Sequence, residues 1–116
     1  MAADVKESKK KLGGNIALVG FEILDPTEIV IVKKIVGNYV RKMSNNGAYQ
    51  EMRLTLQQHK HGKTFKHEIT GFAIFNEGKF NSNVTDWNLF TAISQVCDKM
   101  LEELKQSVRK EDIHKA

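Results

Sequence analysis

Cysteine is scarce in this sequence, which has a single one at position 97. One cysteine excludes a disulfide within the chain, and Cys97 falls on an apolar helical stripe, which favours a buried small side chain over a nucleophile. Long apolar runs are also missing. The strongest, from Ile29 to Val32, is far too short to cross a bilayer, and the first residues lack the apolar segment of a secretory signal. We therefore expect a soluble, cytoplasmic protein without a membrane partner.

Catalytic motifs are missing as well. The sequence has no glycine-rich phosphate-binding loop, and no serine or cysteine has an evident base and orienting partner. Glu102 and Glu103 are adjacent on a predicted helix, so their side chains diverge. No cysteine or acidic cluster completes a metal site around His59, His61 and His67, and protonated histidines among lysines more simply bind phosphate. We expect no enzymatic activity, cofactor, metal site or small-molecule substrate.

Positive charge is abundant and unevenly distributed along the chain. The formal net charge is +4, and the segment from Lys33 to Lys66 has eight basic residues against one acidic residue, Glu51. The basic residues of this segment are Lys33, Lys34, Arg41, Lys42, Arg53, Lys60, Lys63 and Lys66. A surface of one sign is an electrostatic footprint for a polyanion, and it favours a nucleic acid as partner.

Length and composition predict one domain. The chain has 116 residues, of which 41% are apolar, enough for one hydrophobic core. Residues 1–14 combine the lysines of Lys9–Lys11 with a glycine pair, and we expect a flexible basic arm there. We expect the ordered, ribonucleic-acid-facing domain to span 15–108 and a short tail to follow over 109–116.

Changes in the apolar period predict the first elements. A near-continuous apolar run over 15–24 is typical of a central strand. Asp25, Pro26 and Glu28 then form a helix start with a capping box. Apolar residues at spacings of three and four continue this helix to about Met43.

The second half of the chain predicts a meander of strands followed by a helix. We expect strands over 49–57, 64–75 and 79–84, a loop over 59–63, a tight turn over 76–78, and a helix capped by Thr85 or Asp86 that ends near Val108. The predicted fold is α+β. It is a β-α-β-β-β-α two-layer sandwich, with a four-stranded sheet and two helices on one face, as in the double-stranded-RNA-binding domain.

Aromatic residues beside aliphatic ones are expected in the core. They are Tyr39, Phe72, Phe75, Phe80 and Phe90. Trp87 lies at the start of the last helix, and two roles fit this position: it closes the edge of the core, or it stacks on an exposed base.

Three segments carry a family resemblance. The first, within 16–40, contains GFEILDPTE at 20–28 and leads into the basic helix; the second is NEGKF at 76–80; the third is LFTAI at 89–93 with DK at 98–99. Over 15–108 the sequence resembles the short ribosome hibernation factors, which include hibernation promoting factor and the ribosome-associated inhibitor protein Y.

This resemblance implies a non-enzymatic stress-response protein that regulates translation. Members lodge in the decoding channel of the small ribosomal subunit, where messenger and transfer RNA bind, and hold idle ribosomes inactive. In that family, basic groups on the helices and adjoining loops face ribosomal RNA. The corresponding residues of this chain are Lys33, Lys34, Arg41, Lys42, Lys79, Lys99, Lys105, Arg109 and Lys110. The basic segment from Lys33 to Lys66 adds three more candidates, Lys60, Lys63 and Lys66.

The sequence departs from the family pattern in two places, and these affect the expected RNA contacts and ribosome pairing. Glu102 and Glu103 stand where members often have arginine and a polar residue, and carboxylates there would repel phosphate. The chain ends at Ala116 without the dimer-forming domain of the long members, so any ribosome pairing is expected to need another partner.

Two other functions fit the same residues. A general double-stranded-RNA-binding module would bind plain A-form duplex without ribosomes. A protein-interaction domain would use the polar sheet face predicted for Tyr49, Arg53, Thr55 and Gln57, and would tolerate charge reversal at Lys33 and Lys34.

Overall fold

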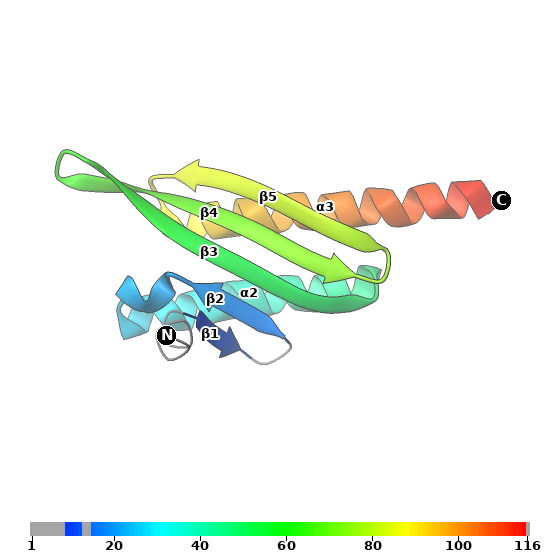
Figure 1. Ribbon diagram of the computed structural model, residues 1–116, viewed down its shortest axis with the longest axis horizontal. Helices are drawn as coiled ribbons and strands as arrows, with labels where there is room; N and C mark the ends of the chain where they lie inside the picture. The colour runs from blue at the N-terminus through cyan, green and yellow to red at the C-terminus, as the bar shows by residue number, and fades with distance from the viewer. Residues whose placement is uncertain (1–8, 13–14, 116) are drawn as a thin grey trace, which may run out of the picture.

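The computed structural model describes residues 9–12 and 15–115, and the side chains from 15 to 109. Figure 1 shows its elements, which are β1 (Lys9–Leu12), β2 (Ile16–Val19), the short 3-10 helix η1 (Phe21–Ile23), α2 (Pro26–Asn46), β3 (Tyr49–His61), β4 (Thr64–Phe75), β5 (Gly78–Asp86) and α3 (Leu89–Lys115). The strands form one sheet in the order β1-β2-β3-β4-β5. Neighbouring strands are antiparallel except β2 and β3, which are parallel and are joined through α2.

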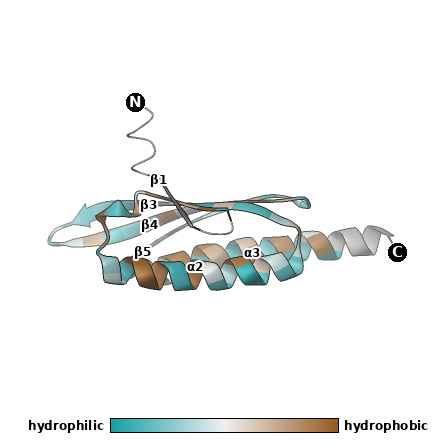
Figure 2. Cartoon of the chain, turned by 90° about the horizontal axis from the view of Figure 1, so that it is seen from below, coloured by the Kyte–Doolittle hydropathy of each residue, from teal (hydrophilic) through white to brown (hydrophobic). Residues whose placement is uncertain are grey.

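Both helices lie on the same face of the sheet. Seen edge-on in Figure 2, α2 and α3 form one layer and the strands form the other. The predicted two-layer α+β sandwich is therefore confirmed. Between the layers, α2 buries Val32, Val36 and Met43, and α3 buries Ile93 and Cys97, so the expected burial of the cysteine is also confirmed.

Helix α2 begins with the predicted capping box. The Glu28 N–H donates to Asp25 Oδ1 at 2.8 Å, and the Asp25 N–H donates to Glu28 Oε1 at 3.1 Å. Pro26 fills the first turn, where a missing N–H costs nothing. The helix continues to Asn46, three residues past the predicted end at Met43, and the Gly47 N–H donates to the Met43 carbonyl at 3.0 Å.

Strand β2, which was predicted over 15–24, is shorter than predicted because the chain turns at Gly20. Gly20 has φ 82°, and a Cβ there would lie 2.5 Å from the Leu56 carbonyl oxygen. Only glycine can adopt a left-handed backbone conformation this close to a neighbouring strand. Beyond it, Phe21–Ile23 forms η1 rather than more strand, and Ile23 is 57% exposed.

A fifth strand lies at the edge of the sheet, in the segment predicted to be a flexible arm. Residues Lys9–Leu12 form β1, antiparallel to β2. The prediction that all of 1–14 lies outside the fold was wrong for these four residues. The rest of that segment lies outside the described residues.

A register shift near the start of β3 changes the face of Tyr49. The Tyr49–Phe75 pair is followed by the Glu51–Ile74 pair, so Gln50 is the extra residue. The Tyr49 ring therefore packs edge-on against the buried Phe75, at 5.6 Å between centroids. The prediction that Tyr49 shares a face with Arg53 was wrong. Beyond this bulge the alternation is as predicted, with Met52, Leu54 and Leu56 facing the helices.

Phe72 corrects a second prediction. It pairs with Arg53 and lies between buried Gly71 and Ala73, which face the helices, so its own side chain is half-buried on the helix-free face. The other four aromatic residues expected in the core do contact it; these are Tyr39, Phe75, Phe80 and Phe90.

The last helix starts later and ends later than predicted. Asn88 is the cap, because its Oδ1 accepts from the Thr91 N–H at 3.0 Å, while β5 continues through Asp86. Thr85 and Asp86 were therefore wrongly predicted as caps. Helix α3 then runs to Lys115, so residues 109–115 are helical rather than a tail. Among the described residues, neither long helix has the apolar length that a membrane crossing requires.

Candidate nucleic-acid interface

The outer surface of the helical layer carries most of the predicted basic residues. Because α2 turns Val32, Val36 and Met43 inward, the positions on its opposite side point to solvent. Its exposed cations are Lys33, Lys34, Arg41 and Lys42. In α3, Lys99 and Arg109 are exposed and Lys105 is half-buried. The α2 and α3 cations therefore share one layer of the molecule.

An open groove separates the two helices. It is lined by Lys42 from α2 and by Asp98, Lys99, Leu101, Glu102 and Lys105 from α3. A second hollow follows at the carboxyl ends of the helices, lined by Asn46, Lys105, Val108 and Arg109. Asp98 and Glu102 weaken the positive field in the first groove, whereas the second has two cations and no acidic residue in its lining.

A side-chain hydrogen bond joins the two helices at this groove. The Tyr39 hydroxyl on α2 donates to Asp98 Oδ1 on α3 at 2.7 Å. Burial, and then this hydrogen bond, raise the pKa of Tyr39 well above its ordinary value. The Lys42 Nζ lies 5.0 Å from the centre of the Tyr39 ring, a cation–π contact that orients the ammonium at the groove.

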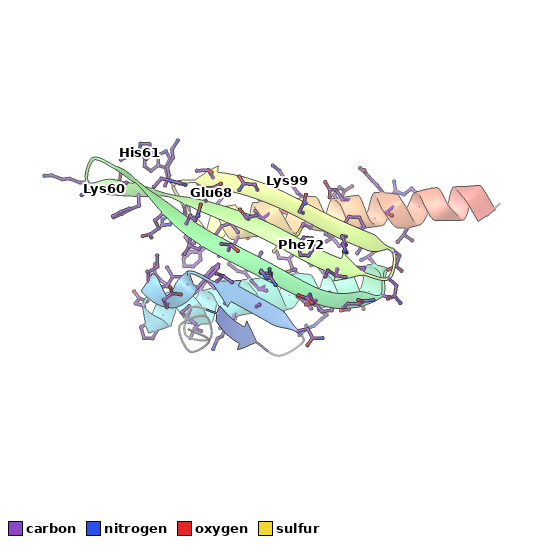
Figure 3. All side chains as sticks on the ribbon, viewed as in Figure 1. Lys60, His61, Glu68, Phe72 and Lys99 are labelled. Atoms are coloured by element: carbon purple, nitrogen blue, oxygen red, sulfur yellow. The ribbon has the colours of Figure 1, made fainter. Side chains whose placement is uncertain are left out.

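Four of the remaining predicted cations belong to the sheet and its hairpin. Lys60, Lys63 and Lys66 lie at the turn end of the β3–β4 hairpin, and Figure 3 shows Lys60 there, well separated from Lys99 on α3. Lys79 pairs with Ile74 on the helix-free sheet face. Lys110 belongs to α3, but its side chain lies outside the described ones. The predicted set is thus split between the helical layer and the sheet.

The three histidines do not share one side of the sheet. His59 Nε2 lies 2.7 Å from Glu68 Oε1 on the helix-free sheet face. His67, one position before Glu68 on β4, points the other way and contacts Gln58 at 3.4 Å. The described residues contain no group of three metal-ligating side chains that could hold an ion.

Glu68 is the centre of a polar cluster on the helix-free face. Its other oxygen accepts from Asn83 Nδ2 at 2.7 Å, and the same amide contacts Thr70 Oγ1 at 2.8 Å. The hydrogen bonds from His59 and then Asn83 lower the pKa of Glu68. Both oxygens of the Glu68 carboxylate therefore already have partners on this face.

Sequence reasoning missed the Tyr39–Asp98 pair and placed Tyr39 simply in the core. The two residues are 59 positions apart, so no local pattern links them. The one available signal was that both lie where an apolar stripe meets a charged one, which is where facing helices exchange polar contacts.

Comparison with known proteins adds evidence on the fold. No protein-family model matches the sequence, and no curated protein does. Eleven chains of solved structures match. One is the N-terminal domain of Protein Y from Thermus thermophilus, with a TM-score of 0.55 and 15% identity. The match covers 84% of this chain and 98% of that domain.

Proposed function

We propose that this protein is a cytoplasmic ribosome hibernation factor that binds the decoding channel of the small ribosomal subunit and holds ribosomes inactive. Two separate likenesses support the proposal. The motifs at 20–28, 76–80 and 89–99 resemble the family that includes protein Y, and the fold is similar to a solved Protein Y domain. The first likeness rests on short stretches of sequence, and the second rests on the arrangement of the helices and strands.

The observation that carries the proposal is the basic surface of the helical layer. Two helices lie side by side and present exposed cations, which can bind the phosphates of a folded RNA without reading its bases. Ribosomal RNA offers a fixed shape, so a rigid charged surface can gain specificity from fit rather than from sequence. The Tyr39–Asp98 hydrogen bond joins the two helices on this surface.

The acidic residues suggest how the contact is distributed. Glu102 lines the first groove and Glu103 is exposed on the same helix. We therefore place the closest phosphate contacts on the outer face of α2 and at the second hollow, where Lys105 and Arg109 converge with Asn46. The middle of α3 then contributes little to affinity.

Co-sedimentation with purified small ribosomal subunits across a salt series tests this function, with a short RNA duplex measured separately. We expect stoichiometric binding to subunits at salt concentrations that abolish duplex binding. Arg41→Glu on α2 should weaken subunit binding and reduce the slope of log K against log salt by about 1. Lys33→Glu combined with Lys34→Glu should weaken it further.

Arg53→Glu is the matched control, because it makes the same charge change at an exposed position on the other face of the sheet. It should leave subunit binding nearly unchanged. Equal, salt-sensitive binding to duplex and subunits would instead favour a general double-stranded-RNA module. Binding to neither would favour a protein-interaction domain.

A further inference from the structure

An aromatic residue is exposed among cations at the turn end of the β3–β4 hairpin. Trp87 is 53% exposed, a large apolar side chain that burial would normally remove from water. Lys66 Nζ lies 5.0 Å from the centre of its ring, and the His61 ring meets it edge-on at 5.4 Å between centroids. Figure 3 shows His61 and Lys60 at this end of the molecule.

The hairpin segment beside Trp87 carries charge of one sign. Residues 58–67 contain three lysines, three histidines and no acidic residue. The nearest carboxylates already have partners: Glu68 accepts from Asn83 and contacts His59, and Asp86 accepts from the Asn88 N–H at 2.8 Å. An anion that approaches Trp87 from the hairpin side therefore meets an excess of positive charge.

The backbone on both sides of Trp87 is fixed. Asp86 pairs with His67 at the end of β5, and Asn88 caps α3. A ring held between a strand and a helix cap loses little freedom on binding a ligand, which favours affinity. Phe65, one position before Lys66 on β4 and 44% exposed, is a second accessible ring, but on the opposite face of this hairpin.

We propose that this hairpin end, made of Trp87, Lys66 and His61, is a second RNA site that binds an unpaired nucleotide of a single strand. The base stacks on Trp87 while Lys66 and the neighbouring hairpin lysines bind the flanking phosphates. Stacking tolerates any base, since every base has a π face, and it excludes duplex RNA, whose bases are already stacked on one another. The site is separate from the helical layer and does not rest on ribosome binding.

The test uses the full chain and an oligouridylate of about six nucleotides, a length within the range that one such domain contacts. Because Trp87 is the single tryptophan, its fluorescence reports this site alone. We expect the oligonucleotide to quench it, and an abasic ribose-phosphate oligomer of equal length and charge to bind more weakly without quenching. A blunt RNA duplex should not quench it either.

Variants separate stacking from charge, with binding measured by the anisotropy of a labelled oligonucleotide. Trp87→Ala should weaken binding about 10-fold, and Trp87→Phe should retain most of it. Val30→Ala removes an equally exposed apolar side chain from α2 and should change nothing. Lys66→Ala should weaken binding more than Lys79→Ala, which removes a lysine from the far end of the same sheet face.

Four results would overturn the proposal: no binding of the oligonucleotide, binding without quenching, equal affinity for the abasic oligomer, or full affinity in Trp87→Ala. The variant with Lys33→Glu and Lys34→Glu distinguishes this site from the proposed function. It should lose small-subunit binding while the oligonucleotide still quenches Trp87.

Discussion

Replacing Gly71 by alanine should destabilise the fold, because α3 packs directly on the backbone of β4 at this position. A Cβ on residue 71 would lie 2.4 Å from Val96 Cγ1 and 2.8 Å from Met100 Cε. Carbon atoms in good contact are about 3.5–4.0 Å apart. The end of Met100 can move aside, but Val96 is β-branched and has one preferred helical rotamer, so the helix itself must shift.

The magnitude follows from two opposing effects. Overpacking of this kind costs about 1–3 kcal/mol. Alanine loses less backbone entropy than glycine on folding, which offsets about 0.5–1 kcal/mol of that cost. We expect a net loss of about 1–2 kcal/mol in the free energy of unfolding, measured by urea denaturation with far-UV circular dichroism. Gly37→Ala is the control, because a Cβ added at Gly37 would have no atom within 4 Å and alanine favours the helix.

A double-mutant cycle tests the cause. Val96→Ala removes the atoms that clash, so its combination with Gly71→Ala should be at least about 1 kcal/mol more stable than the two single losses predict. Simple additivity of the two changes, or a Gly71→Ala variant as stable as Gly37→Ala, would refute the reasoning.

Three further predictions concern single side chains. Asp25→Ala should lower the free energy of unfolding by about 1 kcal/mol in urea denaturation, whereas Asp25→Ser, which can still cap, should restore most of it. Burial, and then the charge of Glu51, raise the pKa of Tyr49 to about 12, so ultraviolet titration of Tyr39→Phe should show the remaining buried tyrosine ionising near there. Since this folded-state pKa exceeds the unfolded one, the stability that Tyr49 contributes is complete below pH ~10 and is lost as the pH rises towards 12. Burial raises the pKa of Cys97 to about 12, so a thiol reagent at neutral pH should react only after denaturant unfolds the chain.

Local signals were sufficient to predict that both helices and the strand meander exist, but not where the last helix begins and ends. The Asp25 capping box and the apolar period of α2 depend on neighbours within one or two turns, and the alternation of β3 depends on period two. Strand β1 gave no such signal, because its lysines resemble a solvated arm. They form a strand because β2 offers an edge to pair with, and lysine is common in edge strands.

The site was harder to predict than the fold. Most of the cations could be identified as exposed from their position in a pattern, but the side of the molecule on which each lies depends on register and on how the hairpin is placed. Lys66 and Lys42 belong to one basic stretch of sequence, yet they lie in different layers, beside Trp87 and Tyr39 respectively. The bulge at Gln50 similarly moved Tyr49 to the other face, and sequence alone gave no indication of it.

The central claim, that the helical layer occupies the decoding channel, is tested most directly by competition. Small ribosomal subunits would be loaded with messenger and transfer RNA or left empty, and retention of the protein would be measured by co-sedimentation at one salt concentration. The account predicts stoichiometric retention on empty subunits and little on loaded ones, with the protein in excess displacing transfer RNA in return. Equal retention on loaded and empty subunits would contradict it.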